Sequence, residues 1–195
     1  MTARTARLGL EGDGLRFAAS TGSGHQLILD DAAGDAGPRP AELLLVSLAG
    51  CAAMDVASIL RKKRQVVDRY EVRIHGVQRD ALHPHVFERI DVLHVIAGSS
   101  IDPEAVRRAI ELSATRYCTV GSNLAAGVAE IHHAYLIQET GCAADGEERF
   151  AEVVVIGPYA QIADGSPELE AGAESRRATR ERAGDSVAHA LPRAR

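Results

Sequence analysis

Two cysteines, Cys51 and Cys118, carry the most reactive chemistry in this sequence. A cysteine thiolate is a nucleophile, and an oxidised cysteine sulfur can condense with a second thiol to form a disulfide. The chain has only three cysteines, too few and too scattered for a disulfide framework or a paired-cysteine zinc site. A widely spaced pair in a reducing compartment indicates either small core residues or redox chemistry. We treat the third, Cys142, as incidental, because it lies in a Gly- and Ala-containing loop.

The composition is that of an ordinary globular protein. The chain has 195 residues, of which 46% are hydrophobic, so it can bury one sizeable core. Its net charge of −5 gives no large basic field to hold a nucleic acid. The N-terminus has no apolar signal-peptide core, and no stretch approaches 18 uncharged apolar residues. We therefore expect a cytoplasmic protein that binds neither membrane nor nucleic acid, and no motif implies a cofactor.

The N-terminal part of the sequence predicts a small sheet followed by a helix. Residues 4–10, 15–20 and 25–30 are typical of short strands, and the Gly-containing turns between them favour an antiparallel meander. Pro40 suits the first turn of a helix. Residues 41–60 are nearly all apolar, and a helix that is apolar all round is buried by its own sheets or by a partner subunit.

The second half of the chain mixes strands and helices without a repeating βαβ unit, which indicates the α+β class. Residues 69–77 and 90–96 alternate with period two, so we expect two paired strands with one buried face each. The further expected elements are a helix from an Asp102 cap to Tyr117, a short helix capped by Thr119 to about Ala126, and a last strand at Ala129–Gln138.

These elements divide the chain into three parts. We expect one compact domain at residues 1–139 and an extension at 140–163 with a possible extra strand at 150–156. Residues 164–195 mix acidic residues and Arg with Ala, Gly, Ser and Pro, which is typical of a disordered charged tail.

Two segments resemble the OsmC/Ohr family. Residues 37–51, GPRPAELLLVSLAGC, are similar to the segment that leads to the peroxide-attacking cysteine of that family. Residues 116–123, RYCTVGSN, are similar to its resolving-cysteine segment, and the 67-residue separation (118 − 51) fits the pattern. The resemblance runs from about residue 4 to 139 and is greatest to the YhfA-like branch, through residues 37–45 and the early Gly24-His25 pair.

The resemblance implies both a fold and a reaction. The implied fold is α+β, with antiparallel sheets around a long buried central helix in an intertwined homodimer. The implied enzyme is a peroxiredoxin-like hydroperoxide reductase of oxidative-stress defence, in which Cys51 attacks the peroxide and Cys118 resolves the sulfenic acid to a disulfide. A dithiol, such as that of a lipoyl protein, would reduce the disulfide. Organic peroxides would suit the apolar Leu44, Leu48 and Met54 near Cys51.

Within the Ohr branch, an Arg from the N-terminal strands favours the thiolate and a Glu near the start of the cysteine helix orients it. Arg16 is the candidate for the first role, although a lone Arg on a surface strand is often simply solvated. For the second role the chain departs from the pattern, because Ala41 stands where the family has its carboxylate and Glu42 follows one position later.

Nine residues separate Glu42 from Cys51 (51 − 42), which places them on opposite faces of a straight helix, about 180° apart. Glu42 can therefore act only if the helix begins after it or if it reaches the partner chain's site. Alternatively, Glu42 is only a favourable charge at the helix start.

Two other charged residues are expected to affect the thiols. Asp55 lies four residues after Cys51, on the same helix face, and would raise its pKa. Arg116 lies beside Cys118 in sequence and could lower the pKa of that thiol. An exposed helix end would leave Cys118 freer to move than Cys51.

Other interpretations of the sequence stay open. The pairs His83/His85 and His132/His133 invite a metal site, but strand alternation sends His132 and His133 to opposite faces, so we predict no metal. The leading rival function is a non-enzymatic dimer that binds an apolar small molecule or a thiol adduct. A third is an interaction module regulated by residues 164–195.

Overall fold

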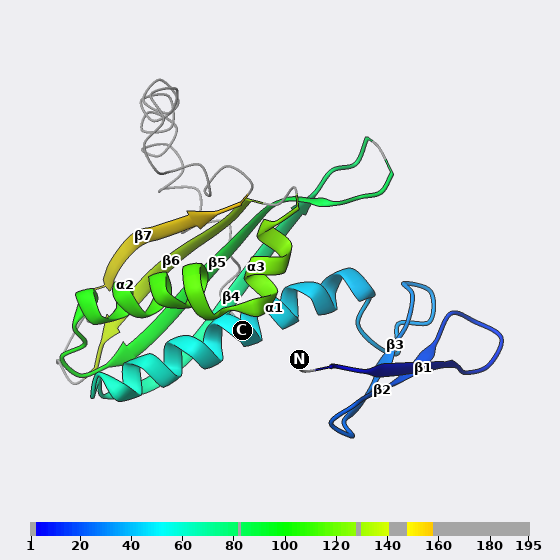
Figure 1. The fold of residues 1–195 in the computed structure, drawn as a ribbon, viewed down its shortest axis with the longest axis horizontal. Helices are drawn as coiled ribbons and strands as arrows, with labels where there is room; N and C mark the ends of the chain where they lie inside the picture. The colour runs from blue at the N-terminus through cyan, green and yellow to red at the C-terminus, as the bar shows by residue number, and fades with distance from the viewer. Residues whose placement is uncertain (1–2, 82, 128–129, 141–147, 158–195) are drawn as a thin grey trace. The chain divides into compact units, whose positions relative to one another are not determined.

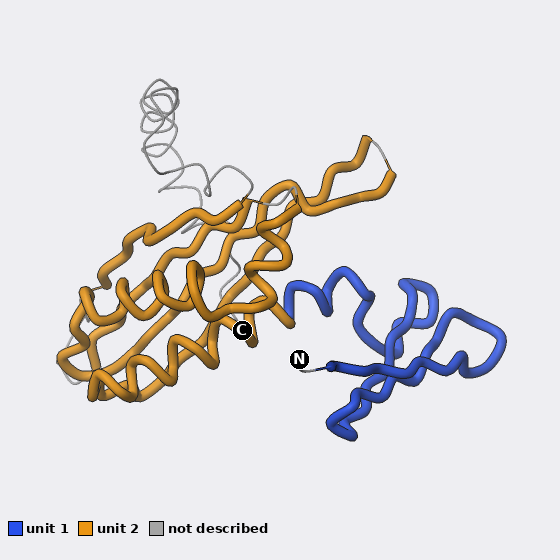
Figure 2. The backbone as a smooth tube through the Cα atoms, in the orientation of Figure 1, with its two compact units in different colours: residues 1–46 blue, residues 47–195 orange. Residues whose placement is uncertain are grey.

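The computed structural model describes residues 3–81, 83–127, 130–140 and 148–157. They form two compact units, residues 1–46 and residues 47–195 (Figure 2). Helices and strands are both present, and the strands form two separate sheets (Figure 1). The α+β class expected from the sequence is confirmed. Cys142 and the charged tail at 164–195 lie outside the described residues.

Unit 1 contains the predicted antiparallel meander. Its strands pair in the order β1-β2-β3, and each begins or ends within two residues of its expected position. The strands are β1 (Ala6–Leu10), β2 (Phe17–Thr21) and β3 (Gln26–Leu29). The loop after β3 folds around the buried Asp30, whose carboxylate accepts hydrogen bonds from the backbone N–H groups of Asp31 and Ala36.

The long helix α1 (Pro40–Lys62) begins at the predicted proline. Glu42 accepts a hydrogen bond from the backbone N–H of Arg39 at 2.8 Å, which satisfies one free donor at the helix start. Within this chain the helix buries a single stripe at four-residue spacing, Leu48, Ala52, Val56 and Leu60. The sequence predicts a helix that is buried on all sides, but a single chain buries only this one stripe of α1.

Among the described residues, α1 is also the one helix that is long and apolar enough to cross a membrane, with a mean hydropathy of 2.1 over its most apolar window. Length and composition alone are weak evidence, because the core helix of a soluble protein meets the same criteria. Here the buried stripe packs on a sheet, and Glu42 and Asp55 interrupt the apolar run.

The sheet of unit 2 has four strands in the order β4-β5-β6-β7. The predicted pair β4 (Val67–Gln78) and β5 (Phe87–Gly98) is antiparallel, as expected. However, β5 and β6 (Glu130–Glu139) are parallel, so the expectation of purely antiparallel sheets was wrong and the sheet is mixed. Between β5 and β6 the chain returns to the starting end of the sheet through α2 (Pro103–Leu112) and α3 (Thr119–Ala125). A helical crossover of this kind makes the next strand run parallel to the previous one.

Strand β7 (Glu148–Ile156) pairs antiparallel with β6 and contains the possible extra strand at 150–156. Ala129–Gln138 is therefore not the last strand, and the sheet continues beyond residue 139.

One face of this sheet is covered by helices α1 and α2 (Figure 1). The core cluster joins Val56 and Leu60 of α1 to Ile110 of α2 and to Ile96 and Ile137 of the sheet. Strand β5 is buried at every residue from Ile90 to Gly98, so the expected single buried face was wrong for β5. On one face Ile96 packs in the cluster with α1 and α2, and on the other face Leu93 and Val95 pack with Ala134 of the neighbouring strand. In β4, residues 70–74 are all half-buried, without alternation between a buried and an exposed face.

Candidate functional site

The structure brings together the two cysteines that the sequence singles out. The sulfurs of Cys51 and Cys118 and a carboxylate oxygen of Asp55 all lie within 4.8 Å of one another. Both thiols are free, and they come from positions 67 residues apart (118 − 51). The fold therefore closes a long loop to place two reduced sulfurs beside one carboxylate.

Helix α1 supplies two of these three groups. Cys51 and Asp55 are four residues apart, so they lie on the same face of the helix, one turn apart. Both are half-buried at the edge of the stripe that packs on the sheet. Because the helix is anchored through that stripe, the two side chains are held on a rigid element.

Cys118 is placed by a change in helix geometry that the sequence did not predict. After α2 the chain forms a π-helical turn, η1 (Ser113–Tyr117), in which the Cys118 N–H donates to the carbonyl of Ser113 at 2.8 Å. Cys118 then caps α3, because its sulfur accepts a hydrogen bond from the Gly121 N–H at 3.2 Å. The expected cap, Thr119, is instead the first residue of α3. Single π turns of this kind are frequent at functional sites.

The surroundings of Cys118 favour a protonated thiol. Cys118 is only 1% exposed. Burial raises the pKa of its thiol to about 12, the hydrogen bond with Cys51 and the negative charge of Asp55 act in the same direction, and the Gly121 N–H partly opposes them.

These surroundings contradict two expectations about Cys118. It is buried rather than exposed, and Cys51 is the more accessible sulfur of the two. Arg116 does not lower the Cys118 pKa; its guanidinium lies over the ring of Tyr117, 5.9 Å from the centroid.

Asp55 is held in place by η1. The Ser113 hydroxyl donates a hydrogen bond to Asp55 Oδ2 at 3.1 Å, and Ser113 is buried. Asp55 was noted in the sequence only as a charge that would raise the pKa of Cys51. The structure makes it a third member of the site, oriented by the same turn that positions Cys118.

Arg16 and Glu42 both belong to unit 1, whereas the two cysteines belong to unit 2. Arg16 lies directly before β2 and forms an ion pair with Glu11 at 3.3 Å, with both side chains about half exposed. Glu42 lies inside the first turn of α1, so the helix does not begin after it. Its remaining route to a thiol is through a partner chain, and the catalytic roles of Arg16 and Glu42 stay predictions.

A buried polar chain lies in the helix-covered face of the sheet, and the sequence analysis missed it. Tyr70 Oη and His94 Nδ1 are 2.6 Å apart, and His94 Nε2 and His133 Nδ1 are 3.4 Å apart. Burial raises the Tyr70 pKa above its ordinary value, and the negative charge of Asp55 raises it further. The sequence held no direct signal for this polar chain, because it depends on the parallel pairing of β5 with β6, which sets His94 opposite Tyr135 and His133 opposite Val92 on one face.

The two buried histidines make stability depend on pH. Burial lowers the His94 pKa well below its ordinary value, and burial and then His132 lower the His133 pKa to about 4. As the pH falls, the histidines of the unfolded chain are protonated before those of the folded chain. The stability that depends on the neutral, buried histidines is therefore complete above about pH 6.5 and is lost as the pH falls toward 4.

We expect the free energy of unfolding to fall by about 2 kcal/mol for His133 alone between neutral pH and about pH 5. Urea denaturation at the two pH values measures it. The variant His133→Leu should lose less stability on acidification, while His25→Gln on an exposed turn should behave as wild type. An equal loss in His133→Leu and wild type would show that His133 is not the source.

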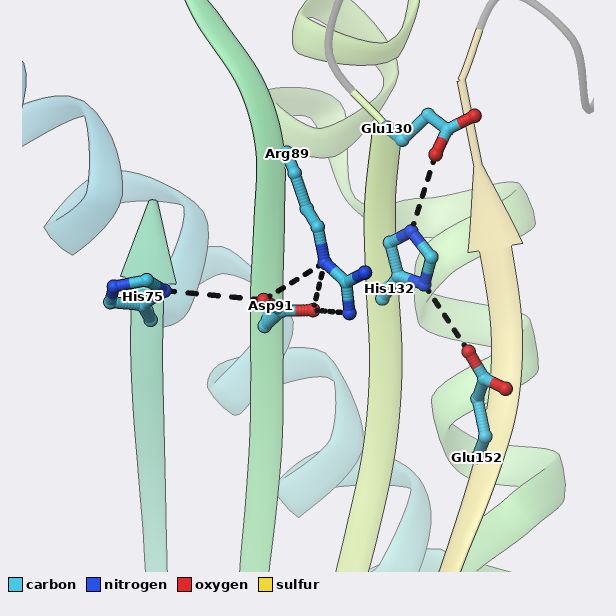
Figure 3. Close-up of polar contacts among 6 residues, drawn as sticks. All are labelled: His75, Arg89, Asp91, Glu130, His132 and Glu152. Carbon is cyan, nitrogen blue, oxygen red and sulfur yellow. Dashed lines mark hydrogen bonds and ion pairs between the residues drawn. The ribbon is translucent and has the colours of Figure 1, made fainter. Parts of the chain in front are cut away.

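His132 and His133 are consecutive residues of strand β6, so they point to opposite faces of the sheet, as strand alternation predicted. Figure 3 shows His132 between Glu130 and Glu152. Its Nδ1 lies 3.2 Å from Glu152 Oε1 and its Nε2 lies 3.4 Å from Glu130 Oε2. On the same face, Arg89 donates two hydrogen bonds to Asp91 Oδ1, at 2.9 and 2.7 Å. Of these contacts, only the one between His132 and Glu152 joins two strands, β6 and β7, whereas Arg89–Asp91 lies within β5 and His132–Glu130 within β6.

Comparisons with known proteins agree with this geometry. The family model described as OsmC-like protein matches residues 32–132, which include both cysteines. Protein YhfA of Escherichia coli strain K12 is 39% identical over 123 residues, which cover 63% of this chain and 90% of that protein.

Solved structures share the fold. A hypothetical protein from Aquifex aeolicus VF5 is 27% identical with a TM-score of 0.62, over 72% of this chain and 100% of that one. An OsmC-like protein from Mycoplasma pneumoniae is 16% identical with a TM-score of 0.57, over 69% of this chain and 95% of that one. With the family match and the similarity to YhfA, they lead to one conclusion: the chain belongs to the OsmC-like protein family.

Proposed function

We propose that this protein is a thiol-dependent hydroperoxide reductase in which Cys51 attacks the peroxide and Cys118 resolves the product. The observation that carries the proposal is the approach of the two reduced sulfurs to within 4.8 Å, beside a single carboxylate. Membership of a family that includes peroxidases supports it. A role in oxidative-stress defence in the cytoplasm is part of the proposal.

In the first step the Cys51 sulfur attacks the outer oxygen of the hydroperoxide. The O–O bond breaks, Cys51 becomes a sulfenic acid, and the thiol proton leaves with the alcohol. Cys51 suits this step because it is the more accessible of the two sulfurs. Cys118 suits it poorly, since its buried thiol holds its proton.

In the second step the Cys118 sulfur attacks the sulfenic sulfur of Cys51. A disulfide forms and the sulfenic oxygen leaves as water, so the Cys118 thiol must give up its proton. Asp55 is the base within reach, because its carboxylate lies within 4.8 Å of the Cys118 sulfur. The hydrogen bond from Ser113 holds that carboxylate in place.

In the third step a dithiol, such as that of a lipoyl protein, reduces the disulfide by thiol–disulfide exchange. The sum is one hydroperoxide and one dithiol converted to one alcohol, one water and one disulfide. The half-buried Cys51 is the sulfur that a reductant meets first.

Organic hydroperoxides are the proposed substrates. The apolar residues that could contact them differ from the set of three that the sequence suggested. Leu48 is fully buried in the stripe of α1 and is not free to contact a substrate. Leu44 and Met54, the other two apolar residues predicted from the sequence, are exposed. A bulky Leu48→Trp substitution would disturb the core, so it does not discriminate the rival ligand-binding function.

Peroxide stoichiometry tests the proposal. The reduced protein, with Cys142→Ser to remove the third thiol, should consume one cumene hydroperoxide per chain and lose two titratable thiols. Cumyl alcohol should appear in equal amount. Retention of both thiols in excess peroxide would contradict the proposal and favour the rival binding function.

The proposed active form is an intertwined homodimer. Helix α1 leaves large apolar side chains exposed in the single chain, and Met54 is 72% exposed. An apolar surface of this kind on a long helix is typical of a subunit interface. A second chain would cover the part of α1 that this chain leaves open.

We expect Met54→Glu to weaken this dimer, because it places a charge in the interface. Light scattering after size exclusion should give twice the chain mass for wild type and for the control Met54→Leu, and a smaller average mass for Met54→Glu. A monomeric wild type at micromolar concentration would argue against the dimer.

A further inference from the structure

The cluster of Cys51, Asp55 and Cys118 has a second chemical property besides its redox chemistry. Two sulfurs and a carboxylate oxygen, all within 4.8 Å of one another, form a compact set of metal-ligating atoms. Soft thiolate ligands with one carboxylate suit a thiophilic ion such as Zn²⁺. From the sequence, the scattered cysteines argued against a paired-cysteine zinc site and the histidine pairs were the metal candidates, so this set of three ligands was not predicted.

We propose that reduced Cys51, Asp55 and Cys118 bind one Zn²⁺ ion, and that the bound ion regulates the site by blocking its oxidation. The inference rests on the proposed function, because the same two sulfurs carry both reactions. A sulfur that is bound to the metal is not free to attack a peroxide or a sulfenic acid. Binding displaces the two thiol protons, so two protons are released for each ion bound.

The separation of the three ligand atoms is already close to what a zinc ion requires. Tetrahedral Zn²⁺ with Zn–S bonds of about 2.3 Å holds two sulfurs roughly 3.8 Å apart. The three ligand atoms already lie within 4.8 Å of one another, so side-chain adjustments of about 1 Å close the site. Two ligands come from adjacent turns of α1 and one from the residue after η1, all within unit 2.

The groups around the ligands also fit a metal site. Ser113 donates a hydrogen bond to Asp55 Oδ2, and the Gly121 N–H donates one to the Cys118 sulfur. Hydrogen bonds of this kind orient metal ligands and are part of most metal sites. Three protein ligands leave one position for water, as in zinc sites that are not purely structural.

Cobalt titration of the full-length protein tests the proposal, because Co²⁺ replaces Zn²⁺ and reports its ligands by absorption. Reduced Cys142→Ser protein should bind one Co²⁺ per chain, with tetrahedral d–d bands and a thiolate-to-cobalt charge-transfer band, and Zn²⁺ should displace it. Cys51→Ser and Cys118→Ser should lose the charge-transfer band of a dithiolate site. Ser113→Ala, which keeps all three ligands, should bind about tenfold more weakly.

Asp55→Asn removes the carboxylate ligand and should weaken Co²⁺ binding. Its matched control, Asp13→Asn, changes a carboxylate on an exposed turn and should bind as wild type. Zn²⁺ should also slow alkylation of the wild-type thiols, a readout that does not depend on any variant folding. An imidazole-type or octahedral Co²⁺ spectrum, or unchanged alkylation, would overturn the metal site.

The two proposals fail separately. If no metal binds and peroxide still removes two thiols, only the metal site is wrong. If Zn²⁺ binds and metal-free protein does not react with peroxide, the reductase function is wrong and the regulatory role falls with it, while the metal site stands. If Zn²⁺ binds without slowing peroxide oxidation, the regulatory part is wrong.

Discussion

Replacement of Cys51 by Ser should abolish peroxide turnover, with a fall of about a thousandfold or more in kcat/KM, because the hydroxyl of Ser is not a nucleophile toward peroxide here. Cys118→Ser should differ in kind. Its Cys51 should still react once, and the sulfenic acid should persist because the substitution removes the sulfur that lies within 4.8 Å of Cys51.

A dimedone adduct detected by mass spectrometry separates these outcomes. It should appear at Cys51 in Cys118→Ser, and be absent from Cys51→Ser and from peroxide-treated wild type that has formed its disulfide. Cys142→Ser serves as the thiol control and should keep wild-type turnover. A dimedone adduct at Cys118 in Cys51→Ser, with rapid peroxide loss, would reverse the assigned roles.

Leu60→Ala should give the largest loss of stability among simple core truncations, about 2–5 kcal/mol. Leu60 is 1% exposed and packs in the cluster that joins α1 to α2 and the sheet, so the truncation leaves a cavity at the base of the helix that carries Cys51. Such a loss is a large fraction of the 5–15 kcal/mol of a typical domain.

Urea denaturation measures this loss, and Leu60→Met, which conserves volume, is the matched control with an expected cost below about 1.5 kcal/mol. A loss for Leu60→Ala no larger than for Leu60→Met would mean that α1 does not pack as the structure has it.

The fold was predictable where local patterns decide it. The meander of unit 1 and the start of α1 at Pro40 follow from Gly-containing turns and from the fixed φ of proline. The parallel pairing of β5 with β6 was not predictable in the same way, because alternation gives a strand its faces but not its partner. For the same reason β5 was expected to have one exposed face.

The candidate site was predictable in its sulfurs and not in their surroundings. Motif and spacing identified Cys51 and Cys118, but the burial of Cys118 depends on the π turn η1, which no propensity in the Ser113–Tyr117 segment signals. The contact of Asp55 with Ser113 joins residues 58 positions apart, so only the tertiary structure reveals it. Arg116 gives the opposite case, because it is close to Cys118 in sequence while its guanidinium lies over the ring of Tyr117.

Peptide mapping by mass spectrometry after one equivalent of cumene hydroperoxide, with free thiols blocked by alkylation, detects the proposed disulfide itself. We expect a disulfide between the peptides that contain Cys51 and Cys118, with Cys142 alkylated and therefore free. Two alkylated thiols at Cys51 and Cys118, or a disulfide that requires Cys142, would contradict it.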